Sequence, residues 1–285
     1  MTVSEGNSSS KTPILPSMAT LSVPSLAMTS TLFRPSPFLD RLCKWLSTVI
    51  GTDQLIMLIQ YSLDIITHHM NTNTLARLAK VLNNYLAFLG RGSIAPKLSA
   101  TPSPMSTRLK SLSAKLSDVR ILLRLHGIIP TYRWLLNTHA SPPSDPTIST
   151  VTKLQTYANM LYFPLENAAY LGSHGFIPMS KRTETDLWLW SCRFWGAHVA
   201  LDFVRLYRER QIRLTEEREK RAKGEKVAAQ GWDKTWWAEL IVNLAYAPLT
   251  VHWSLEKGLG FRDVEIGYLG LIAAVGSIYL GFPAS

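Results

Sequence analysis

The sequence predicts an all-α fold: a helical integral membrane protein with an N-terminal amphipathic-helix region and one to three C-terminal membrane-embedded helices. Three observations predict it. Charged residues make up only 18% of the 285 residues, against about 25% in an average soluble protein. Apolar residues recur at helical spacing through most of the chain. Near the C-terminus, residues 266–282 contain no charged side chain.

Residues 1–36 form a segment that is rich in Ser, Thr and Pro and poor in charge, which is typical of a disordered tail. Its most apolar stretch, "MATLSVPSLAM", is interrupted by Ser and Pro and follows Glu5 and Lys11. We therefore predict no secretory signal.

Residues 37–140 are predicted to form the N-terminal amphipathic helical region. Helices are expected over 38–50 and, with Thr52 as the cap, over 53–70. A third apolar helix over about 75–89 stops at "GRG", and a Pro/Ser linker at 93–106 separates it from the helix that follows.

The clearest periodicity lies at 108–124. Five residues three or four positions apart form one apolar stripe: Leu109, Leu112, Leu116, Val119 and Leu123. Basic residues flank the stripe: Arg108, Lys110, Lys115, Arg120 and Arg124. Long basic side chains can lay their stems along hydrocarbon and lift their charges to a phosphate layer. The stretch by itself is equally compatible with a stripe that faces a protein core.

Residues 150–285 are predicted to form a C-terminal membrane region, after a second linker near 138–150. A highly charged segment at 205–226 interrupts this region and is expected to lie in water as an extended helix or a loop.

The strongest candidate span is 266–282, which would be roughly 26 Å long as a helix, close to the ~30 Å hydrocarbon thickness. Its Gly, Ala and Ser residues are the kind that let membrane helices approach closely. Residues 186–207 are a weaker candidate, because Arg193 near a bilayer centre is costly unless it is paired. For 236–253, spanning, interfacial and packed positions all stay open.

No catalytic, cofactor-binding or metal site is predicted, and we expect no enzyme activity. The seven His residues show no HxxxH pair, and no G-x-S-x-G, P-loop or G-x-G-x-x-G motif occurs. Glu166 and Asn167 are polar residues in an apolar context, where an internal hydrogen bond is the expected role. A formal net charge of +10 in so apolar a chain favours anionic lipid over nucleic acid as the partner.

Four segments, in this order, resemble the peroxin-11 family of peroxisomal membrane proteins, which elongate and proliferate peroxisomes. They are "GTDQLIMLIQYSLDII" (51–66), "SDVRILLRLHGIIPTYRWL" (117–135), "LYFPLENAAYLG" (161–172) and the charged segment with the Gly-rich span after it. The resemblance covers roughly 38–282. The Pro/Ser linker and the long basic segment after Arg205 suggest a divergent branch.

The resemblance implies a peroxisomal membrane location and an amphipathic helix that inserts into the cytosolic leaflet; the helix at 108–124 matches it in position and character. The expected membrane-binding residues are Arg108, Leu109, Leu112, Lys115, Leu116, Val119, Arg120, Leu123 and Arg124. The expected function is elongation and tubulation of the membrane, with proliferation and division of peroxisomes. An anionic phospholipid membrane is the expected partner, with self-association through small-residue faces and organelle-division proteins as further candidates. Two alternatives stay open: a peroxisomal channel for small metabolites and a soluble helical scaffold.

Overall fold

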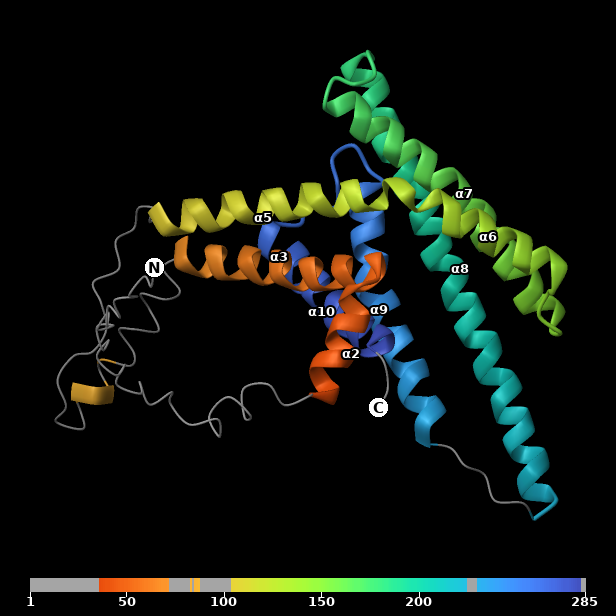
Figure 1. The fold of residues 1–285 in the computed structure, drawn as a ribbon. Coiled ribbons are helices and arrows are strands. Elements are labelled where there is room, and N and C mark those ends of the chain that lie inside the picture. Colours follow the sequence, from red (N-terminus) through yellow and green to blue (C-terminus); the bar gives the residue numbers. More distant parts are fainter. Residues whose placement is uncertain (1–35, 72–82, 84, 88–103, 225–229, 283–285) are drawn as a thin grey trace, which may run out of the picture. The chain divides into compact units, whose positions relative to one another are not determined.

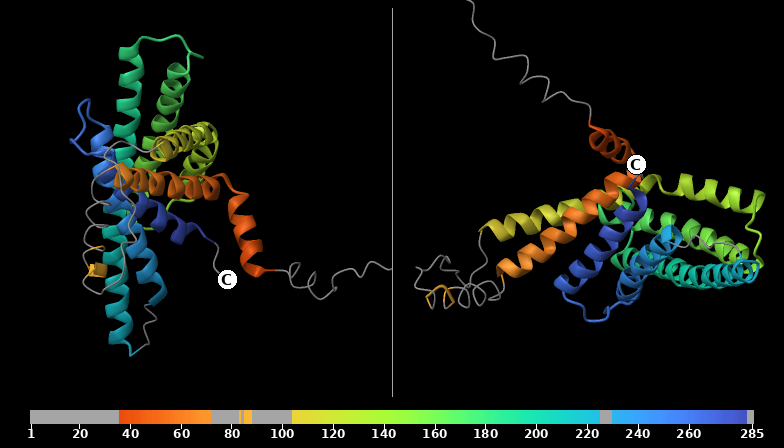
Figure 2. Two further views of the ribbon diagram at one scale, coloured as in Figure 1. Left: turned by 90° about the vertical axis from the view of Figure 1, so that its left-hand side faces the viewer. Right: turned by 90° about the horizontal axis from the view of Figure 1, so that it is seen from below.

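The computed structural model describes residues 36–71, 83, 85–87, 104–224 and 230–282. Every regular element in these ranges is a helix, as Figures 1 and 2 show, and the all-α prediction is confirmed. Residues Arg41–Ser285 form one compact unit, which holds every contact discussed below. Of the other unit, Met1–Asp40, the described residues are Ser36 and the start of α2 (Pro37–Leu46).

Helix α3 (Val49–Asn71) packs against both α5 (Pro104–Leu123) and α10 (Asp263–Gly281). Near the start of α3, the Gln54 amide donates a hydrogen bond to the Ser277 carbonyl near the end of α10, at 3.1 Å. Further along α3, the Tyr61 ring lies against Gly270. Helices α3 and α10 are therefore antiparallel. Figure 1 shows α5 running alongside α3.

The small residues of α10 are used inside the chain. A Cβ atom built on Gly270 would lie 2.4 Å from the Tyr61 ring, and one on Gly276 would lie 2.4 Å from the side chain of Val242 in α9 (Gln230–Trp253). Because glycine has no Cβ atom, α3 and α9 can approach α10 closely at these two positions. The core cluster at this contact consists of Met57, Tyr61, Ala245, Ala273 and Ala274. The small residues from which we predicted self-association thus contact α3 and α9 of the same chain, and self-association stays a prediction.

Two helices in the described part of the chain are long and apolar enough to cross a membrane: residues Val49–Met70 of α3 and the whole of α10. Only 22% and 28% of their most apolar stretches are buried, which argues against two core helices of a soluble protein. The span predicted at 266–282 lies within α10 except for its last residue, Phe282. The span at α3 was not predicted, and neither 186–207 nor 236–253 meets the same criterion.

Helices α7 (Pro146–Ser173) and α8 (Lys181–Ala222) form a long hairpin. Asp145 caps α7 by accepting hydrogen bonds from two backbone N–H groups and also pairs with Arg208 of α8 at 2.8 Å. Because Arg208 lies level with the start of α7, the remaining 14 residues of α8 run past it by roughly 21 Å (Figures 1 and 2). The charged segment predicted at 205–226 is thus a continuous helix as far as Ala222.

The structure describes only parts of the predicted linkers. The one near 138–150 corresponds to the short connection between α6 (Ile128–Ala140) and α7. The 3-10 helix η1 (Arg124–His126) and Gly127 connect α5 to α6 and interrupt the α-helical conformation between them. The tail up to residue 35 and most of the 93–106 linker lie outside the described residues, as does the predicted helix at 75–89 except for residues 83 and 85–87, which are helical. The last three residues of that linker, from Pro104, are already helical because α5 begins there.

Candidate functional site

The apolar stripe of α5 lies along the side of the helix and is only partly covered. Leu112 is 45% exposed and Val119 is 38% exposed, whereas Leu109, Leu116 and Leu123 are half-buried. The structure therefore brings the five predicted stripe residues onto one face and leaves its outer edge uncovered by protein.

A different face of α5 packs against α3, and this face is polar. Ser106, Ser113 and Arg120 are buried, and they lie seven residues apart. At 100° per residue, the face they form is about a quarter turn from the centre of the apolar stripe. Helix α5 therefore contacts its neighbour through small and polar side chains and directs much of its apolar surface away from the protein.

Helix α3 supplies the matching polar row. The Arg120 guanidinium donates to the Asp53 carboxylate at 3.0 Å and to the Gln60 side-chain carbonyl at 2.9 Å. One turn further along, the Ser113 hydroxyl donates to the Asp64 carboxylate at 2.5 Å. Burial lowers the pKa of Arg120, but the Asp53 carboxylate and the nearby Tyr61 and Tyr246 together outweigh burial, so the net shift of this pKa is upward.

A second buried ion pair joins the end of α5 to α7. Arg124 donates two hydrogen bonds to Glu166, at 2.8 and 3.0 Å, in a bidentate arrangement. The adjacent Asn167 amide donates to the Leu125 carbonyl at 3.2 Å. The internal hydrogen bonds predicted for Glu166 and Asn167 are therefore present.

The five flanking basic residues do not share one environment. Arg108 and Lys115 are exposed, and Lys110 is exposed but pairs with Asp263 of α10 at 2.8 Å. Arg120 and Arg124 were expected to contact lipid, but in the structure each guanidinium donates to a carboxylate of another helix. Arg120 pairs with the partly buried Asp53 and Arg124 with the buried Glu166.

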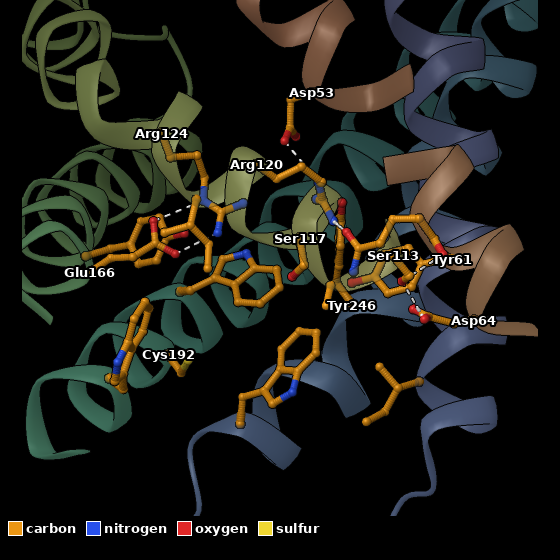
Figure 3. A pocket seen from close by; sticks show the side chains of 18 of the residues that line it. Asp53, Tyr61, Asp64, Ser113, Ser117, Arg120, Arg124, Glu166, Cys192 and Tyr246 are labelled. Carbon is orange, nitrogen blue, oxygen red and sulfur yellow. Dashed lines mark hydrogen bonds and ion pairs between the residues drawn. The ribbon is translucent and has the colours of Figure 1, made fainter. Parts of the chain in front are cut away.

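A cavity of about 780 Å³ lies where α3, α5, α7, α8, α9 and α10 meet. Figure 3 shows Arg120, Arg124 and Ser117 along one side of it, with Glu166 and Asp64 at opposite ends. Aromatic residues from α7, α8 and α9 form much of the remaining wall: Tyr162, Trp188, Trp195, Tyr246 and Trp253. In the described part of the chain, no group of three or more His, Cys, Asp or Glu residues could hold a metal ion.

Comparisons with known proteins place these features in a family. The family model described as Peroxisomal biogenesis factor 11 (PEX11) matches residues 84–280. An uncharacterized protein of Schizosaccharomyces pombe is 32% identical over 164 residues, which are 58% of this chain and 71% of that protein. No solved structure matches the chain.

Proposed function

The chain belongs to the Peroxisomal biogenesis factor 11 family, and from this premise we propose that it elongates and tubulates the peroxisomal membrane by inserting the apolar edge of α5 into the cytosolic leaflet. Membership implies a role in peroxisome biogenesis and an association with the organelle. The insertion mechanism, and the resulting proliferation and division of peroxisomes, form our proposal.

One observation carries the mechanism: α5 is docked through its polar face, so its exposed apolar edge can meet lipid without leaving α3. Leu112 and Val119 lie on that edge, and Arg108 and Lys115 are exposed beside it. Each of these two basic residues would contribute about 1 kcal/mol near an anionic surface. A soluble scaffold would instead be expected to bury this edge.

The two long apolar helices support the same mechanism because both contact α5. Helix α3 contacts α5 along its polar row, and α10 reaches α5 through the pair between Lys110 and Asp263. The exposed edge of α5 therefore lies beside helices that are themselves apolar enough to meet lipid. Apolar volume added to one leaflet expands that leaflet and favours curvature.

The test is a labelling scan of α5 in the full-length protein. Cys43 and Cys192 are replaced by Ser, and single cysteines carrying an environment-sensitive fluorophore are placed along α5 in liposomes that contain anionic lipid. Labels at 112 and 119 should report an apolar environment, whereas labels at 107 and 111, on another face, should report water. Equal signals at the four positions would contradict insertion of the stripe.

Self-association and contacts with organelle-division proteins stay predictions. The metabolite channel, the alternative function predicted from sequence, can be tested in the same liposomes by release of a small encapsulated solute. Tubulation without release would favour the proposed function over the channel.

A further inference from the structure

We propose that the cavity bounded by α3, α5 and α7–α10 binds one zwitterionic phospholipid. The lipid phosphate would lie beside Arg120 and Arg124, and the ammonium group of the same head group would lie beside Asp64. This site is separate from the α5 edge and does not depend on the function proposed above.

The size and position of the cavity suit a lipid. Its volume of about 780 Å³ falls within the range of roughly 300–1,000 Å³ that is typical of small-molecule sites. Residues from both candidate spans line it, among them Tyr61 of α3 and Ile266 of α10. A molecule in the cavity would thus touch helices that are themselves suited to lie in a bilayer.

The guanidinium side of the cavity can bind a phosphate. A guanidinium group carries five N–H donors. The hydrogen bonds of Arg120 to Asp53 and Gln60 start from two of its nitrogens, and those of Arg124 to Glu166 also start from two. Each guanidinium group therefore has further N–H donors that its protein partners do not use. Ser117, which lies between Ser113 and Arg120 in the sequence of α5, also lines the cavity and adds a hydroxyl group.

The charge balance of the lining calls for a cation in addition. Three of the lining acids are paired with the three lining bases: Lys110 with Asp263, Arg120 with Asp53, and Arg124 with Glu166. The fourth acid, Asp64, accepts its hydrogen bond from the neutral Ser113 hydroxyl instead. In a ligand that carries both a phosphate and an ammonium group, the phosphate accepts from the remaining guanidinium donors and the ammonium pairs with Asp64. An anionic lipid would leave Asp64 without a cation.

The two groups of binding residues are offset along α3. Arg120 is bound at the level of Asp53 and Gln60, and Asp64 lies four residues beyond Gln60, a rise of roughly 6 Å. The phosphate and the ammonium of one head group would therefore lie at neighbouring positions along this helix.

The aromatic wall provides apolar surface for the glycerol backbone and the acyl chains. The Trp195 ring lies at the centre of this wall, with its centroid 5.3 Å from that of Tyr246 and 5.8 Å from that of Trp253. Aromatic faces also accept the methyl groups of a quaternary ammonium, so a choline head group fits the cavity as well as a primary amine does.

The experiment is native mass spectrometry of the full-length protein, delipidated in detergent and then offered phosphatidylcholine or phosphatidylglycerol of equal chain length. We expect one phosphatidylcholine per chain, bound about tenfold or more tightly than phosphatidylglycerol. Glycerophosphocholine, which has the same head group without acyl chains, and inorganic phosphate should not displace it. Displacement by either one would mean that the ligand is water-soluble, and would overturn the assignment to a lipid.

Two variants test the residues. Asp64→Asn can still accept the hydrogen bond from Ser113 but lacks the charge, so the preference for phosphatidylcholine should fall about tenfold. Asp118→Asn, on α5 but outside the cavity lining, is the matched control. Ser117→Phe fills the cavity and should abolish binding, whereas Ser111→Phe on the exposed face of α5 should not. An unchanged preference in Asp64→Asn, or equal retention of lipid in the two Phe variants, would overturn the proposal. If Ser117→Phe does not fold, the isosteric Asp64→Asn comparison decides alone.

Discussion

Placing charge on the exposed edge of α5 should abolish membrane tubulation while leaving the protein folded. The perturbation is the double variant Leu112→Glu and Val119→Glu. Both side chains are exposed at the edge of the stripe, and neither lies on the buried polar face that contacts α3. The docking of α5 should therefore survive, and the change should act on lipid contact alone.

The magnitude follows from the exposed fractions. Burying a whole Leu or Val side chain contributes about 1.5–3 kcal/mol. Only the exposed parts, 45% of Leu112 and 38% of Val119, are available to lipid. Their combined contribution is about 1.2–2.5 kcal/mol, which corresponds to a factor of roughly 10 to 70 in an equilibrium constant. Repulsion between the new carboxylates and anionic head groups makes this factor a lower bound.

The assay measures tubulation of liposomes as a function of the protein-to-lipid ratio. The ratio at which tubules appear should rise by at least roughly tenfold in the double variant. The control is Thr107→Glu and Ser111→Glu, which adds the same charge to exposed positions on another face of α5. If the control and the stripe variant shift the threshold equally, or if neither does, the stripe does not act by insertion. In cells, the stripe variant should reach peroxisomes but fail to elongate them.

Three further predictions concern stability. Arg124→Met should lower the free energy of unfolding by about 3–5 kcal/mol because it leaves Glu166 buried without a cation; addition of Glu166→Leu should restore most of the loss, and a double variant as unstable as the single one would contradict this reading of the pair. The hydrogen bond from Arg208, with those from two backbone N–H groups, holds the pKa of Asp145 below its ordinary value, so the stabilisation is present above about pH 4 and is lost as the pH falls through the lowered pKa. The Tm advantage of the wild type over Asp145→Asn should accordingly be full at pH 7 and shrink as the pH falls below about 4, and an advantage that is the same at pH 7 and pH 2 would count against it. Gly270→Leu should cost about 1–3 kcal/mol by overpacking against α3; an unchanged Tm would show that the helices can move apart freely.

The local features of the fold could be predicted from the sequence because they depend on neighbouring residues. The apolar stripe of α5 follows from three- and four-residue spacing, and its five residues share a face in the structure. The long uncharged run near the C-terminus and the break after α6 are equally local signals. Each of these predictions needed only a short stretch of sequence.

The partners of Arg120 and Arg124 could not be predicted in the same way. A basic residue beside an apolar stripe gives the same pattern whether it reaches a lipid phosphate or a carboxylate of a distant helix. The choice depends on contacts such as that with Asp53, 67 positions earlier in the chain. A weaker signal was present: the polar residues Ser106, Ser113 and Arg120 repeat at seven-residue intervals, as do the polar residues Asp53, Gln60 and Thr67 of α3. Two such rows suggest a polar seam between two helices.

The same seam explains why α3 was not predicted to be a span. Asp53 and Asp64 lower its mean hydropathy, and they suggest an amphipathic helix when they are read alone. In the structure both carboxylates face α5 and are hydrogen-bonded there. The side of α3 that could meet lipid is therefore more apolar than the average composition of the helix.

The close packing of α3 against the glycines of α10 changes how the effects of glycine substitutions in this protein should be interpreted. Glycine substitutions in a membrane helix are often interpreted as defects of assembly, but here Gly267 and Gly270 receive Ile65 and Tyr61 of the same chain. A loss of oligomers after such a substitution would therefore follow from damage to the subunit itself. The exception is an exchange of α3 between two copies, which would reuse the same contacts in a swapped dimer. A disulfide engineered between α3 and α10 would then link two chains instead of closing a loop within one.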